Sequence, residues 1–89
     1  MSETTRLVKV TQVVEVTTDD NKFDAEFMRE FVESFYPYDT IEEHTEHLAQ
    51  LHARGVYDLE GKSEFVEGYG PQAEMGIRVK TVSVDTEPA

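Results

Sequence analysis

The chain has no cysteine and only eight basic residues against nineteen acidic ones. Without cysteine there can be no disulfide, no thiol catalysis and no cysteine-ligated zinc or iron–sulfur centre. No apolar run approaches the roughly 20 residues of a membrane-spanning helix, and residues 1–6 lack the basic-then-apolar layout of a secretory signal. We therefore expect a cytoplasmic protein that is stabilised by packing alone.

The 89 residues predict one small domain, 1–89, with frayed ends at 1–5 and 86–89. A chain of this length buries only about 60–65% of the surface that its unfolded form exposes. The predicted core is accordingly thin, and a catalytic domain together with a separate cofactor domain would not fit.

The net charge of −11 is concentrated in the middle of the chain. Residues 15–67 contain fifteen acidic and four basic side chains, whereas the two ends together contain four of each. Such a field repels nucleic-acid phosphates and acidic lipid headgroups and attracts a basic surface. We expect a protein partner with a basic surface, no direct nucleic-acid binding and no membrane binding.

The first predicted element is a long valine-rich strand over residues 6–17, whose core face carries Val8, Val10, Val14 and Val16. Helices are predicted over residues 24–35 and 41–54. Asp24 is the expected N-cap of the first, and Thr40 with Glu43 forms a capping box for the second. The phenylalanines of the first helix, including Phe35, are predicted to be core residues.

Two further strands are predicted, over residues 63–68 and 76–84, and they should pair as an antiparallel hairpin. In the last strand Val79 faces one way and Val82 and Val84 the other, so either a bulge shifts the register or both faces are partly covered. The expected fold is α+β in the order β-α-α-β-β, a three-stranded sheet with two helices packed on one face.

The first strand also raises the question of oligomeric state. At the edge of a sheet, this long apolar strand would present unpaired backbone N–H and C=O groups to other chains unless it were covered. A homodimer formed through it would cover it, and so would a central position between two other strands. The sequence leaves both arrangements open.

The histidines suggest a metal site as one alternative. His44 and His47 lie three residues apart, and a small metal-dependent hydrolase could be centred on them together with Glu43. The zinc-protease pattern requires histidines four residues apart, so the spacing does not match. We predict no catalytic residue, no metal and no cofactor, with the histidines as structural residues.

The predicted partner-binding residues are exposed helical glutamates and the tyrosines at the break between the helices: Glu26, Glu30, Glu33, Glu42, Glu43, Glu46, Tyr36 and Tyr38. The glutamates could equally form an ordinary solvated helix exterior, and the tyrosines could cap the core. A narrower hypothesis is that the carboxylates imitate phosphates and the protein inhibits a nucleic-acid-binding protein as a DNA mimic.

Residues 30–38, 40–55 and 67–77 (EFVESFYPY, TIEEHTEHLAQLHARG and EGYGPQAEMGI) resemble small, acidic, uncharacterised proteins encoded by bacteriophages and prophages. This resemblance implies a location in the cytoplasm of a bacterial host and an accessory role. The sequence therefore predicts a non-enzymatic phage-related protein that acts by protein–protein interaction.

Overall fold

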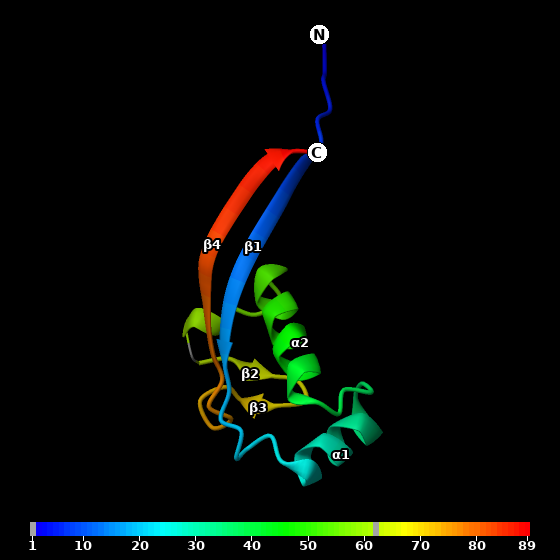
Figure 1. Ribbon diagram of the computed structural model, residues 1–89, viewed down its shortest axis with the longest axis vertical. Helices are drawn as coiled ribbons and strands as arrows, with labels where there is room; N and C mark the ends of the chain where they lie inside the picture. The colour runs from blue at the N-terminus through cyan, green and yellow to red at the C-terminus, as the bar shows by residue number, and fades with distance from the viewer. Residues whose placement is uncertain (1, 62) are drawn as a thin grey trace.

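The computed structural model describes residues 2–61 and 63–89 and has the α+β composition that the sequence predicts. In chain order its elements are β1 (Val8–Thr17), α1 (Ala25–Ser34), α2 (Ile41–Ala53), the 3-10 helix η1 (Leu59–Gly61), β2 (Phe65–Val66), β3 (Gly70–Pro71) and β4 (Arg78–Pro88), as Figure 1 shows.

The strands form two separate antiparallel pairs, so the predicted single three-stranded sheet is wrong. β1 pairs with β4 along its whole length, from Val8 opposite Pro88 to Thr17 opposite Arg78. β2 pairs only with β3, through two residues of each strand. Gly68, in the turn between β2 and β3, and Gly70, the first residue of β3, have φ values of +90° and +87°, which close a tight turn, and Pro71 has no amide hydrogen to donate to a further strand.

A bulge in β4 resolves the register conflict that the sequence contains. Val13 lies opposite Ser83, but the next residue, Val14, lies opposite Thr81, which leaves Val82 as the extra residue. Because side chains alternate along a strand, the extra residue moves Val84, opposite Gln12, to the same face as Val79, opposite Val16. Of the two alternatives drawn from the sequence, the bulge is confirmed.

Both helices begin and end where local chemistry dictates. The Asp24 carboxylate accepts the Phe27 N–H at 2.9 Å, and the Thr40 hydroxyl accepts the Glu43 N–H at 3.2 Å. At the end of α2 the N–H groups of Gly55 and Val56 bond back to the carbonyls of His52 and Leu51, a Schellman motif with Gly55 at φ +72°.

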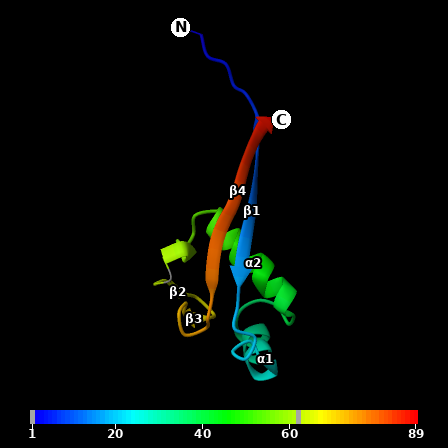
Figure 2. The ribbon, with the colours of Figure 1, turned by 60° about the vertical axis from the view of Figure 1, so that its left-hand side comes forward.

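The helices do not share one face of a sheet, in contrast to the prediction. α2 packs beside the lower part of β1, whereas α1 lies past the end of that strand (Figures 1 and 2). The apolar side of α1 packs on aromatic rings instead: Phe31 lies 4.6 Å from the His44 ring and 5.1 Å from the Tyr69 ring, between centroids. A Cβ at Gly68 would come within 2.7 Å of Phe31, so this close packing requires glycine there.

The core lies at the lower end of the molecule, and its buried residues come from Phe23 through Val79. Its buried apolar members are Phe23, Phe31, Leu48, Leu59, Val66, Tyr69, Ile77 and Val79. Gln72 is also buried, and its Nε2 donates to the carbonyls of Leu59 and Ile77. This side chain therefore ties η1 to the segment that leads into β4.

The upper half of the β1–β4 ribbon extends beyond this core. We call residues 7–12 and 84–89 the arm and the remainder the body; every arm residue is exposed. The molecule measures 58 × 25 × 21 Å, and its radius of gyration of 16.1 Å exceeds the roughly 12 Å expected for a compact domain of this length. Residues 86–88, expected to be frayed, belong to β4, and the Ala89 N–H bonds to the Leu7 carbonyl at 3.1 Å.

Within residues 2–61 and 63–89, no helix combines the length and the apolar character needed to cross a membrane.

Candidate functional site

The glutamates predicted to bind a partner lie on the outside of both helices. Five of the six are exposed, and the sixth, Glu43, is partly buried and accepts a hydrogen bond from the Thr40 hydroxyl at 3.0 Å. Among the described residues, none of the six forms an ion pair, since the two ion pairs present are Lys9–Glu87 and His52–Glu60. Their negative charge is thus left uncompensated within the part of the chain described.

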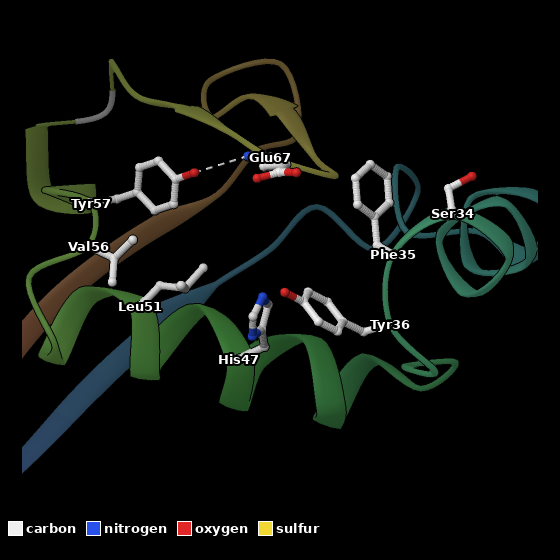
Figure 3. A pocket seen from close by; sticks show the side chains of 8 residues that line it. All are labelled: Ser34, Phe35, Tyr36, His47, Leu51, Val56, Tyr57 and Glu67. Atoms are coloured by element: carbon white, nitrogen blue, oxygen red, sulfur yellow. Dashed lines mark hydrogen bonds between the residues drawn. The ribbon is translucent and has the colours of Figure 1, made fainter.

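Beside this acidic surface is an open groove, seen from close by in Figure 3. It has a volume of about 390 Å³ and lies between the end of α1, the middle of α2 and the segments around η1 and β2. Its lining residues are Ser34, Phe35, Tyr36, His47, Leu51, Val56, Tyr57 and Glu67, which we call the aromatic groove.

Phe35 belongs to this groove and not to the core, so its prediction as a core residue is wrong. The side chain is 43% exposed, because α1 ends at Ser34 and Phe35 leaves the helical path with φ −128° and ψ −86°. Val56 and Tyr36 are also more than half exposed. The groove therefore presents apolar surface to solvent.

The two tyrosines predicted from the sequence are brought together with His47. The Tyr36 and Tyr38 rings stack with centroids 5.6 Å apart, and His47 lies 5.6 Å from Tyr36 and 5.1 Å from Tyr38. Figure 3 shows the Tyr36 side chain directed toward His47. Tyr38 also stacks on the buried Phe31 at 6.2 Å, so it serves as a core cap, whereas Tyr36 is 52% exposed.

A smaller hollow joins the aromatic residues to the acidic ones. It has a volume of about 100 Å³, and its lining residues are Tyr38, Glu43, Glu46, His47 and Gln50. Glu43 and Glu46 therefore lie next to Tyr38. Glu26, Glu30, Glu33 and Glu42 line none of these hollows.

His44 is directed into the core, where its Nδ1 lies 2.7 Å from the Tyr69 hydroxyl. Burial lowers the pKa of His44 and raises the pKa of Tyr69, so both groups are neutral near pH 7. Burial also lowers the pKa of His47. These histidines add no positive charge to the acidic surface at neutral pH.

The Glu43, His44 and His47 constellation is not assembled as a metal centre. Within residues 2–61 and 63–89, no group of three or more His, Asp or Glu side chains has the arrangement needed to hold a metal ion. The Nδ1 of His44 is engaged by Tyr69, while His47 lines the surface groove. The geometry gives the hydrolase alternative no support.

Several groove residues were not among the predicted partner-binding residues. Tyr57 accepts a hydrogen bond from the Glu67 N–H at 3.4 Å, which links the segment before η1 to the end of β2. Val56 is the last residue of the Schellman motif of α2, and an apolar residue directly after the helix-stopping Gly55 was the available signal. Long-range placement of these residues beside Tyr36 depends on the fold and has no local signature.

Comparison with known proteins gives no relative: no family model, no curated protein and no solved structure matches the chain significantly. The resemblance to phage-encoded proteins and the cytoplasmic location therefore stay predictions.

Proposed function

We propose that the protein is a non-enzymatic binding protein that holds a basic segment of a protein partner. The observation that carries this proposal is that the aromatic groove adjoins, at His47, a smaller hollow lined by Glu43 and Glu46, which have no ion-pair partner among the described residues. The groove supplies apolar contact, and the glutamates supply the charge that selects the partner.

The chemistry of such a surface favours arginine. A guanidinium group can pair with a carboxylate and also stack on an aromatic ring. Glu43 and Glu46 line the smaller hollow together with Tyr38, and the exposed Tyr36 ring stacks on Tyr38, so both kinds of contact are offered side by side. An apolar side chain of the partner would enter the groove between Phe35, Leu51 and Val56. Affinity should fall with salt, because charge attraction between exposed groups is screened over about 8 Å at physiological ionic strength.

The test is titration with an arginine-rich peptide that contains one tryptophan, followed by NMR. We expect the largest amide shifts at Tyr36, His47 and Val56. Changing Glu30, Glu33, Glu42 and Glu46 to lysine should weaken binding at least tenfold while the far-ultraviolet circular dichroism is unchanged.

A matched control changes the charge equally at other exposed positions: Glu3, Glu15, Asp58 and Glu74 to lysine. This control should keep most of the affinity, since net charge alone does not hold the peptide. If both quadruple variants lose the same affinity, or if the shifts are spread evenly over the chain, the proposed surface is not the binding site.

The DNA-mimic hypothesis is a narrower form of this proposal, in which the basic partner is a nucleic-acid-binding protein. Competition distinguishes the two: duplex DNA would displace the protein from such a partner. If a bound partner keeps its DNA affinity in the presence of this protein, the mimic hypothesis fails while the binding proposal stands. A phage accessory role is supported only by the sequence resemblance.

A further inference from the structure

The arm exposes an apolar face that no other part of the chain within residues 2–61 and 63–89 covers. Val8, Val10 and Val84 lie on one face of the ribbon, and their side chains are 61%, 55% and 56% exposed. A two-stranded ribbon without a hydrophobic partner is only marginally stable in water. The arm is therefore a surface that gains stability when another molecule covers it.

The outer edge of β4 is protected against strand pairing. Pro88 lacks an amide hydrogen, and the bulge at Val82 interrupts the strand. At the base of the ribbon the Thr81 N–H donates to the Glu60 carboxylate at 2.8 Å. A partner strand thus finds a blocked edge at both ends of β4.

The outer edge of β1 is open along the arm. The bond from the Ala89 N–H to the Leu7 carbonyl fixes which backbone groups face β4, and by alternation those of Val8 and Val10 face outward. No described segment of the chain pairs with them. Lys9, a residue type that discourages edge pairing, has its charge matched by Glu87 across the ribbon, with Nζ and Oε1 3.6 Å apart.

The charge of the arm indicates which kind of molecule pairs with the open edge of β1. With Arg6 included, the arm carries two basic and two acidic side chains, so it offers no field to a strongly charged partner. Two arms can meet without strong repulsion, because the arm is neutral and the α2 residues that lie against β1, Ala49, Gln50 and Ala53, carry no charge. A second copy of this chain meets these requirements.

We infer that β1 pairs with β1 of a second copy, antiparallel about a two-fold axis, to form a four-stranded sheet with the two β4 strands outermost. Because the β4 edge is blocked, the assembly closes as a dimer and does not grow into a filament. This inference is independent of the proposed function.

Two hollows along β1 can receive partner side chains. One, of about 490 Å³, lies at the tip between residues 6–8 and 86–89. The other, of about 410 Å³, lies between β1 and α2 and is lined only by uncharged residues: Gln12, Val13, Val14, Ala49, Gln50 and Ala53. On a chain with a net charge of −11, this uncharged strip suits a neutral strand.

Sedimentation equilibrium of the full chain tests the inference. We expect a monomer–dimer equilibrium in the wild type. Val10→Pro removes an outward N–H and should raise the dimer dissociation constant tenfold or more. Thr86→Pro is the matched control. Thr86 lies directly opposite Val10, and its replacement by proline removes an outward N–H from the β4 edge. This variant should leave the dimer dissociation constant nearly unchanged.

Cysteine scanning provides a second readout that does not depend on proline being tolerated. Since the wild type has no cysteine, single substitutions at Val8, Lys9, Val10 and Thr11 report directly on pairing between copies. Intermolecular disulfides should form at one or two of these positions and not at Thr86. A wild type that is monomeric at all concentrations overturns the inference, and so does a dimer that Thr86→Pro weakens as much as Val10→Pro.

Discussion

The two ends of the β1–β4 ribbon have the same kind of sequence and different surroundings. At the base, Val79 is buried and Val16 is partly buried against the core. At the tip, Val8 and Val84 occupy the same face and are more than half exposed. The register of the ribbon, including the bulge at Val82, therefore determines which side chains share a face, and the surrounding chain determines whether that face is covered.

This difference separates residues that stabilise the fold from residues available for binding. Burial of apolar side chains in the body contributes to the free energy of unfolding, whereas the arm valines retain much of their contact with water. Each prediction below tests how far this separation holds.

The largest effect is expected from truncation in the body. Leu48 is completely buried, and Leu48→Ala should lower the free energy of unfolding by about 2–5 kcal/mol, because it removes buried methyl groups and leaves a cavity. Val10→Ala in the arm should cost less than about 1 kcal/mol in dilute protein, since Val10 is already 55% exposed. Urea unfolding measures both, and similar losses would show that the arm belongs to the folding core.

An intermediate effect is expected when the buried contact between His44 and Tyr69 is removed. Tyr69→Phe leaves the Nδ1 of His44 without its hydroxyl partner and should lower the free energy of unfolding by about 1–3 kcal/mol. Tyr36→Phe is the matched control, because Tyr36 is exposed and the loss of its hydroxyl leaves no buried group without a hydrogen-bond partner. This variant should change the free energy of unfolding by no more than about 0.5 kcal/mol. An equal response of the two variants would contradict the buried role of Tyr69.

The smallest expected effect is a dependence of the free energy of unfolding of the body on pH. Burial lowers the pKa values of His44 and His47 in the folded state, whereas an unfolded histidine has a pKa of about 6.5. Below this pH the unfolded state binds more protons, so the free energy of unfolding falls as pH decreases and levels off below the folded pKa values.

Urea unfolding between pH 7.5 and 5.5 measures this dependence. His47→Gln should reduce its slope while leaving stability at pH 7.5 nearly unchanged, because the groove residue contributes little packing that glutamine cannot supply. Stability that rises on acidification over this interval would contradict the direction of these pKa shifts.

Local signals in the sequence account well for the helices. Asp24, Thr40 and Gly55 each act within a few residues, and the predicted helix limits differ from the observed ones by one residue at each affected end. The bulge was also one of two alternatives that the pattern of Val79, Val82 and Val84 allowed. In these cases the determining interactions are short-range.

The strand pairing and the groove could not be predicted in this way. Pairing of β1 with β4 joins residues about 70 positions apart, and no local feature distinguishes it from a hairpin between the last two strands. Phe35 follows the helical apolar period but leaves the helix at its C-cap, so periodicity placed it in the core. The glutamates proposed to bind a partner were predicted from charge alone, and only the fold sets Glu43 and Glu46 beside Tyr38.

Amide hydrogen exchange at two protein concentrations tests most directly the separation between a self-sufficient body and an arm that pairs with a second copy. We expect the Val8 and Val10 amides to be protected in concentrated protein and to exchange rapidly on dilution, while the Leu48 amide is equally protected in both. Protection at Val8 and Val10 that does not change with concentration would contradict the account.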